Sequence, residues 1–206
     1  MKITFKTGAR GKVTVFANGE AIAAVDEEFR LTCGYKDNDE IEGARLTAFI
    51  EAACQRSAFL GATRLLALRD HSKKELENKL CAKGHKRVYA ARVCDMLEEN
   101  GCIDDRAYAF SLAKRLCDGK GYSARRIKSE LFQKGISREI ADEVCQGIDN
   151  EPILRIIELL NTKFSGRLST EKGVKKTFAA LQRMGYGYSD IRSAMAQADI
   201  SIQPED

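Results

Sequence analysis

The sequence predicts a mainly α-helical fold: three tandem three-helix repeats in an elongated, curved array, preceded by a small N-terminal β-hairpin and helix extension. Three observations lead to this fold class. Proline is nearly absent, with two in 206 residues, while Ala, Leu, Lys, Arg and Glu are abundant, which favours helices. The glycines Gly84, Gly135 and Gly185 end similar segments 51 and 50 residues apart, as tandem repeats do. The first 25 residues carry a strand-like pattern instead.

Residues 1–56 are predicted to form the extension. Residues 11–16 alternate and are β-branched, Asn-Gly at 18–19 is a hairpin turn signal, and residues 21–25 can form the returning strand. A short helix from Asp26 to Leu31 is expected to be capped by Asp26, and apolar spacing predicts a longer helix over 42–55. Because an isolated hairpin is marginally stable, we expect it to pack against another part of the chain.

The three repeats are predicted over residues 57–103, 104–149 and 150–206. In each, a leucine lies four residues before the glycine, which is expected to end the second helix in a left-handed cap. Ser72 and Ser123, twelve residues before the first two glycines, are expected to cap the same helices at their start. The predicted helices span 59–69, 72–83 and 86–99, then 105–117, 123–134 and 137–147, and finally 152–163, 170–184 and 188–198.

Apolar residues recur at helical spacing on these helices and indicate the core. In the second repeat they include Ala107, Phe110 and Ala113. Since short helices are marginal alone, the repeats are expected to gain stability by burying this stripe against one another.

Positive charge is concentrated in the first two repeats. The whole chain has a net charge of +4, residues 60–147 carry 18 basic and 13 acidic side chains, and residues 148–206 carry 8 of each. Two basic clusters at matching repeat positions are the candidate binding surface: Lys73, Lys74, Lys79, Lys83, Lys86 and Arg87, then Lys120, Arg125, Arg126, Lys128, Lys134 and Arg138. Such groups can follow a phosphate backbone or an acidic protein groove; a merely solvated helix face is the alternative. The neutral third repeat is assigned to protein contact or to capping the array.

Enzyme chemistry is not indicated. No nucleophile with an orienting base and no dinucleotide fingerprint occurs. The two histidines, His71 and His85, lack a metal-ligand pattern, and the seven cysteines lack zinc or disulfide spacing. We therefore expect no catalytic residue, cofactor or metal.

Gly119-Lys120-Gly121 is interpreted as a flexible inter-helix turn rather than an anion-binding loop. No signal peptide or membrane segment is apparent, so a cytoplasmic monomer without a membrane partner is expected.

Three strings resemble the bacterial RecX family of recombinase regulators: residues 67–76, 100–109 and 121–131. The middle string, beginning Asn-Gly-Cys-Ile-Asp-Asp, is similar to the family's most recognisable element. Cys102 replaces the aromatic residue usual there, a conservative change if the position is buried. The resemblance covers about 58–198, and residues 1–55 resemble, more weakly, the extension of longer members.

The resemblance implies a protein that binds the RecA recombinase and its filament on single-stranded DNA. It would modulate, and in the main inhibit, recombinase activity in DNA repair, recombination and the SOS response. It also implies that basic residues face DNA or the acidic filament surface, with weak, non-specific binding of single-stranded DNA. A free-standing helical DNA-binding transcription regulator is the alternative, since three-helix units resemble helix-turn-helix modules. A nucleic-acid enzyme is disfavoured by the lack of clustered acids or histidines.

Overall fold

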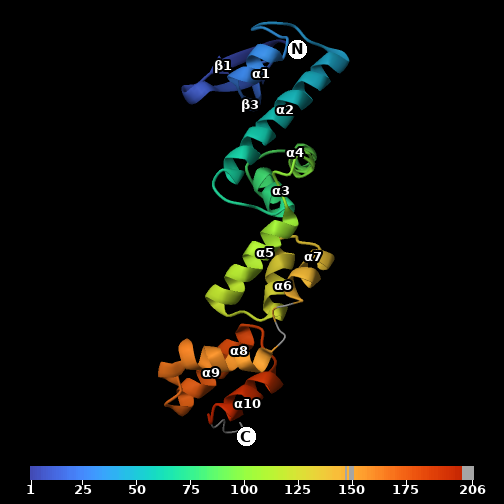
Figure 1. The fold of residues 1–206 in the computed structure, drawn as a ribbon. Helices are drawn as coiled ribbons and strands as arrows, with labels where there is room; N and C mark the ends of the chain where they lie inside the picture. The colour runs from blue at the N-terminus through green and yellow to red at the C-terminus, as the bar shows by residue number, and fades with distance from the viewer. Residues whose placement is uncertain (147, 149–150, 201–206) are drawn as a thin grey trace. The chain divides into compact units, whose positions relative to one another are not determined.

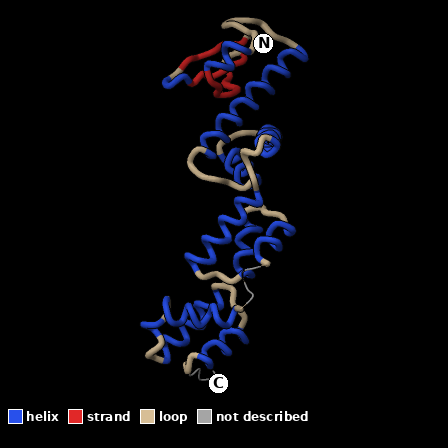
Figure 2. The backbone as a smooth tube through the Cα atoms, viewed as in Figure 1, coloured by secondary structure: helices blue, strands red, loops and turns tan. Residues whose placement is uncertain are grey.

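The computed structural model describes residues 1–146, 148 and 151–200. The chain divides into two compact units, Met1–Asp104 and Asp105–Asp206, which are blue to green and green to red in Figure 1. Helices dominate both units, and the strands lie together near the N-terminus, as Figure 2 shows. The predicted fold class, mainly helical with an N-terminal hairpin, is confirmed.

The sheet of the first unit has three antiparallel strands in the order β1 (Ile3–Thr7), β2 (Lys12–Ala17) and β3 (Glu20–Asp26). The predicted hairpin is formed by β2 and β3, and its turn residues Asn18 and Gly19 both have positive φ, 50° and 85°, as a tight hairpin requires. Sequence analysis missed β1. It pairs with β2 from Ile3 opposite Ala17 to Thr7 opposite Val13, and a short 3-10 turn, η1 (Ala9–Gly11), joins the two strands.

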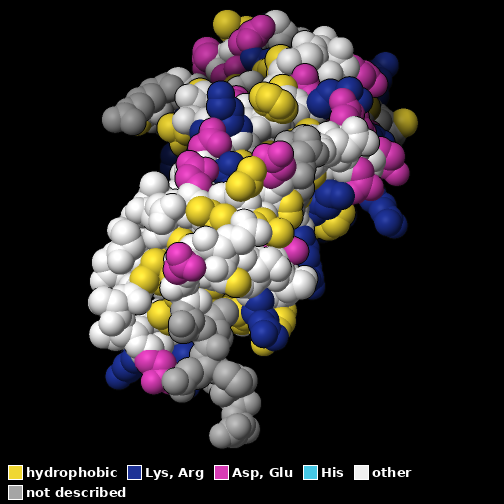
Figure 3. Space-filling model, turned by 60° about the horizontal axis from the view of Figure 1, so that its bottom comes forward, with side chains coloured by type: hydrophobic (Ala, Val, Ile, Leu, Met, Phe, Trp, Pro, Cys, Tyr) yellow, Lys and Arg dark blue, Asp and Glu magenta, His cyan; other side chains and the backbone are white. Residues whose placement is uncertain are grey.

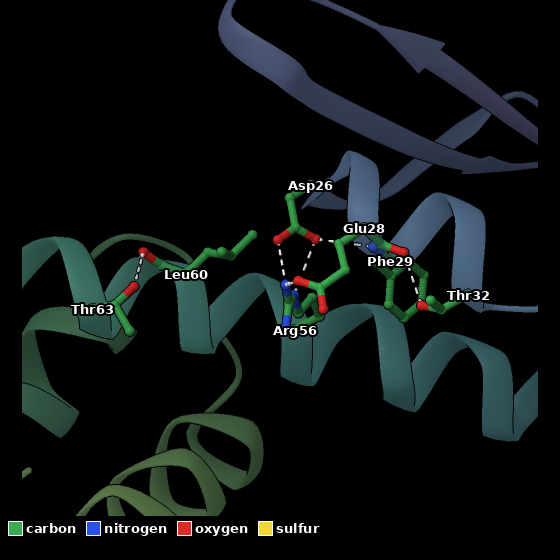
Figure 4. Close-up of polar contacts among 7 residues, drawn as sticks. All are labelled: Asp26, Glu28, Phe29, Thr32, Arg56, Leu60 and Thr63. Atoms are coloured by element: carbon green, nitrogen blue, oxygen red, sulfur yellow. Dashed lines mark hydrogen bonds and ion pairs between the residues drawn. The ribbon is translucent and has the colours of Figure 1, made fainter.

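Helix α1 (Glu27–Thr32) is capped as predicted, because the Asp26 carboxylate accepts a hydrogen bond from the Phe29 amide at 3.2 Å. The same carboxylate binds Arg56 of helix α2 (Gly43–Leu66). Figure 4 shows Arg56 pointing from α2 toward both Asp26 and Glu28. These ion pairs of Arg56 with Asp26 and Glu28 join α1 to α2 beside the sheet.

The prediction of two separate helices over 42–55 and 59–69 was wrong, because α2 is one helix of 24 residues. Neither glycine nor proline interrupts residues 55–59, and the buried face continues through Ala53, Ala58 and Ala62, all 0% exposed. The first half of α2 packs on the sheet and the second half packs against the helices that follow. The predicted boundary between residues 56 and 57 therefore lies inside a helix.

The remaining helices begin and end close to the predicted positions. The first unit continues with α3 (Lys73–Ala82) and α4 (Arg87–Glu99). The second unit contains α5 (Asp105–Arg115), the π-helical turn η2 (Leu116–Lys120), α6 (Ala124–Gln133), α7 (Arg138–Cys145), α8 (Pro152–Thr162), the 3-10 turn η3 (Ser165–Arg167), α9 (Glu171–Arg183) and α10 (Tyr188–Gln197). The predicted end of α7 at 147 and the repeat boundary at 149–150 lie outside the described residues.

The predicted helix caps at Ser72, Ser123 and the three glycines are confirmed. Ser72 accepts a hydrogen bond from the Glu75 amide at 3.1 Å, and Ser123 accepts one from the Arg126 amide at 3.3 Å. After the second helix of each repeat, Gly84, Gly135 and Gly185 have φ of 93°, 78° and 96°, the left-handed conformation expected for these caps.

Among the described residues, buried apolar side chains form four clusters in chain order. They lie around the sheet and the start of α2, among α2, α3 and α4, among α5, α6 and α7, and among α8, α9 and α10. The division into an extension over 1–56 and repeats over 57–103, 104–149 and 150–206 stays a proposal. One cluster corresponds to each part, but α2 continues across the first boundary.

Three residues that were expected to be buried are exposed. Phe110 is 63% exposed and Ala107 is also exposed. The buried face of α5 is the neighbouring one, which carries Tyr108 and Leu112. Cys102, expected at a buried position, is exposed in the turn before α5.

The second and third repeats meet at the turn formed by η2 and Gly121. The hydroxyl of Tyr186 donates to the Gly121 carbonyl at 3.1 Å. Arg155 donates to the Cys117 carbonyl at 2.8 Å, and Lys163 donates to the Lys120 carbonyl at 2.9 Å. Residues 119–121 thus lie in a turn between helices, and side chains of the third repeat bind the carbonyl groups of Lys120 and Gly121.

Candidate nucleic-acid interface

The first basic cluster is carried by α3 and the start of α4, and half of its cations bind carboxylates of the same unit. Lys73 Nζ lies 2.7 Å from both Asp95 and Glu98 of α4, and hydrogen bonds to these two carboxylates raise the pKa of Lys73. Lys74 and Arg87 share Glu77, at 3.1 and 2.8 Å. These three cations serve internal contacts: those of Lys73 and Arg87 join α3 to α4, and that of Lys74 lies within α3.

Lys79, Lys83 and Lys86 are placed differently. Among the described residues, none of the three has a carboxylate oxygen within 4.0 Å. Lys83 and Lys86 are exposed and lie on either side of Gly84, while Lys79 is half-buried one turn earlier. The end of α3 thus presents cations that are available to an external anion.

The second basic cluster, on α6 and the start of α7, shows the same division. Lys128 and Arg138 both bind Asp142, at 2.7 and 3.7 Å. Arg126 binds Glu130 at 2.6 Å, and its guanidinium lies 5.5 Å from the centre of the Tyr122 ring.

Arg125 and Lys120 are the more available cations of this cluster. Both are exposed, and neither has a carboxylate within 4.0 Å among the described residues. Lys120 Nζ lies 5.3 Å from the centre of the Tyr122 ring, and Arg125 lines a shallow depression on α6 with Lys128, Ser129 and Phe132. Lys134 is half-buried near the end of the helix.

Sequence analysis missed a third basic cluster on α9. Residues 163–183 contain one acidic residue, Glu171, so their net charge is 6 − 1 = +5. The basic residues are Lys163, Arg167, Lys172, Lys175, Lys176 and Arg183. Arg167, Lys172 and Lys176 line a depression between η3 and α9. The acids that make the third repeat neutral lie elsewhere, so counting over whole repeats concealed the cluster.

Aligning the second helices on their glycines would have revealed the equivalence. Ten residues before the glycine stand Lys74, Arg125 and Lys175, and all three are exposed. The surface nevertheless carries both signs of charge: in Figure 3, dark blue and magenta side chains lie next to one another over the upper part of the visible face.

Other kinds of site have little support in the structure. Within the described ranges there is no group of three or more His, Cys, Asp or Glu side chains arranged to hold a metal ion. His71 is 3% exposed and its Nδ1 lies 2.9 Å from Glu75, which places it in the turn before α3. Cys94 is buried, and burial raises the pKa of its thiol to about 12. No helix in residues 1–146 or 151–200 is long and apolar enough to cross a bilayer.

Fold and surface together define a helical-repeat protein whose second helices are basic. Residues 104–144 match the family described as RecX, second three-helix domain. The regulatory protein RecX of Chromohalobacter salexigens is 34% identical over 140 residues, 66% of this chain and 90% of that protein. The regulatory protein RecX of Clostridium botulinum strain Alaska E43 is 24% identical over 208 residues, 96% of this chain and 94% of that protein. A crystal structure of a regulatory protein RecX superposes with a TM-score of 0.63 at 18% identity, covering 93% and 98% of the two chains.

The chain belongs to the RecX family of regulatory proteins, which are not enzymes. The match to the Clostridium protein extends over nearly the whole chain.

Proposed function

We propose that this protein binds the RecA recombinase and its filament on single-stranded DNA, and that it inhibits recombinase activity in DNA repair and recombination. The observation that carries the DNA contact is a set of exposed cations, present in each repeat, that have no carboxylate within 4.0 Å among the described residues: Lys83, Lys86, Arg125, Lys172 and Lys176. Cations without an internal partner are available to a phosphate backbone. The RecA contact rests on membership of the family and on the resemblance described above.

The interface that we propose consists of the two clusters predicted from sequence, with the cluster on α9 added. Within it, Lys79, Lys83, Lys86, Lys120 and Arg125 are assigned to the ligand. Lys73, Lys74, Arg87, Arg126, Lys128 and Arg138 bind carboxylates of their own unit, and we assign them mainly to holding the helices. The assignment of Lys134 stays a prediction.

A major-groove reader is less well supported. The recognition helix of a helix-turn-helix module presents polar and basic side chains to base edges. The third helix of the second repeat, α7, instead presents Glu139, Asp142 and Glu143 beside Arg138. Asp142 and Glu143 also bind Arg138 and Arg106, so this face offers little net positive charge to the phosphates that line the groove.

The function is tested by adding the protein to RecA with single-stranded DNA and ATP. We expect ATP hydrolysis and strand exchange to fall when the protein is stoichiometric with the filament. Unchanged rates of ATP hydrolysis and strand exchange at that ratio would contradict the proposal. Faster rates would contradict the proposal that the protein inhibits RecA. Selective binding of one duplex sequence would favour the transcription regulator.

The assignment of cations is tested by two variants of equal charge. Lys83→Gln with Lys86→Gln removes two cations without an internal partner, whereas Lys74→Gln with Arg87→Gln removes two that share Glu77. The first variant should bind oligothymidylate more weakly, and the slope of log affinity against log salt should flatten by roughly 0.7 per lost contact. The second should stay near the parent. Equal losses in both variants would mean that only total charge matters.

A further inference from the structure

Phe132 is an exposed aromatic side chain among cations. It is 47% exposed and lies near the end of α6. Arg125, Lys128 and Ser129 are seven, four and three residues before it, so all four share one face of the helix. These side chains and Ala124 line a single depression.

The core does not account for this aromatic. The opposite face of α6 is buried through Ile127 and Leu131, both 0% exposed, and the described residues supply no second ring that pairs with Phe132. Tyr122, by contrast, is covered by Lys120 and Arg126 and packs against the core. Three residues before the glycine, the first and third repeats have Cys81 and Gln182, so the aromatic belongs to the second repeat.

An exposed ring next to cations has the chemistry of a single-strand binding site. Bases stack on aromatic side chains while phosphates bind neighbouring Lys and Arg, and every base offers a π-face, so the contact is tolerant of sequence. Bases in a duplex are already stacked on one another and cannot use the ring in this way. Arg125, which has no carboxylate within 4.0 Å among the described residues, stands two helical turns from Phe132 on the same face.

We propose that Phe132 is a stacking platform for one base of a single-stranded nucleic acid, and that Arg125 binds an adjoining phosphate. The inference rests on the proposed function, since it specifies how the second repeat contacts DNA. An apolar side chain of a protein partner is the competing occupant of the same depression.

Two oligonucleotides of equal length separate stacking from phosphate binding: oligothymidylate and an abasic strand with the same backbone. The full-length parent, Phe132→Leu and Phe110→Leu are titrated with each by fluorescence anisotropy. The leucine at 132 keeps an apolar side chain and removes the ring, and Phe110, on α5, provides a matched exposed phenylalanine. The parent should bind oligothymidylate about tenfold more tightly than the abasic strand. Phe132→Leu should remove most of this preference without weakening abasic binding, and Phe110→Leu should behave as the parent.

The chain has no tryptophan, so Phe132→Trp supplies a single tryptophan, whose fluorescence can be excited selectively. Stacking predicts that oligothymidylate quenches this fluorescence and that the abasic strand leaves it nearly unchanged.

Three outcomes would overturn the inference while leaving DNA binding intact. The parent could bind the two strands with equal affinity, or Phe110→Leu could lose the preference for oligothymidylate as Phe132→Leu does. Alternatively, Phe132→Leu could weaken binding to RecA filaments only. The last would assign the depression to a protein partner. Failure of the parent to bind either strand would instead overturn the DNA contact itself, and the inference with it.

Discussion

At the scale of single residues, internal carboxylates decide which cations a ligand can reach. Glu77 binds Lys74 and Arg87, and Asp142 binds Lys128 and Arg138. Exposed ion pairs of this kind contribute little to stability, about 0–1 kcal/mol each. They nevertheless neutralise much of the positive field near their cations, so a count of basic residues overstates the charge that a phosphate meets.

The Asp26 carboxylate provides a pH-dependent contribution to the first unit. The hydrogen bond from Arg56 is the main cause that lowers the pKa of Asp26 below its usual value of 3.8, and the Phe29 amide assists. Because the folded-state pKa is the lower one, the stabilisation is present above about pH 4 and is lost as the pH falls through the folded value. We expect Asp26→Asn to lower the free energy of unfolding by about 1 kcal/mol at pH 7, and by much less at pH 3.

Urea unfolding followed by circular dichroism at both pH values measures this difference. Asparagine keeps an oxygen that can accept from the Phe29 amide, so the variant isolates the charge. Glu28→Gln is the control, because Glu28 binds the same Arg56 but its side chain is 73% exposed. An equal Asp26→Asn deficit at pH 3 and pH 7 would contradict an electrostatic origin.

At the scale of elements, sequence predicted best what is determined locally. Ser72, Ser123 and the three glycines act within one turn of their own helix, and these helix ends were predicted to within a residue or two. The sequence does not determine whether neighbouring helical patterns fuse, which is why α2 was divided in two. Strand β1 was missed because its place depends on pairing with β2 rather than on its own pattern.

The candidate site could be predicted only in part, because some of its features are local in sequence and others depend on contacts between helices. The basic clusters are visible in sequence, but their ion pairs join residues on different helices, as Lys73 does with Asp95 and Glu98. The exposure of Phe132 follows from the face of α6 that Ile127 and Leu131 bury. An error of one residue in helical phase rotates the predicted face by about 100°, which is enough to exchange buried and exposed positions, as it did for Phe110.

The contact between α6 and the turn after α9 predicts a sharp cost at Gly185. A Cβ there would lie 2.4 Å from Ser123 Oγ and 3.0 Å from the Arg126 backbone nitrogen, in addition to the strain of φ 96°. We expect Gly185→Ala to destabilise the second unit by about 3 kcal/mol or more. Gly84→Ala, at φ 93° with no atom within 4 Å of the added carbon, should cost about 1 kcal/mol in the first unit.

Thermal and urea unfolding of both variants, each against the parent, test this difference. A Gly185→Ala cost no larger than that of Gly84→Ala would mean that the turn after α9 moves away from α6 without penalty.

At the scale of the whole molecule, the three basic helices should act on one DNA strand together. The net charge of the third repeat does not indicate that α9 is basic, because the acidic residues elsewhere in the repeat cancel the cations of α9. Since linked weak sites raise one another's effective concentration, a modest cluster in each repeat can suffice for binding without a single strong site.

The cluster on α9 gives the decisive prediction at this scale. Lys172→Gln with Lys176→Gln removes two exposed cations that line one depression and that have no carboxylate within 4.0 Å among the described residues. If the third repeat binds phosphate, this variant should flatten the salt dependence of oligothymidylate binding by roughly 0.7 per lost contact, as Lys83→Gln with Lys86→Gln does. Combining the four substitutions should then give the sum of the two changes in slope, because the cations lie in different units.

Arg192→Gln with Lys114→Gln provides the control of equal charge, since Lys114 lies on α5 and Arg192 lies 5.9 Å from the Tyr188 ring on α10. A parent-like slope for the α9 variant would restore the assignment of the third repeat to protein contact or capping.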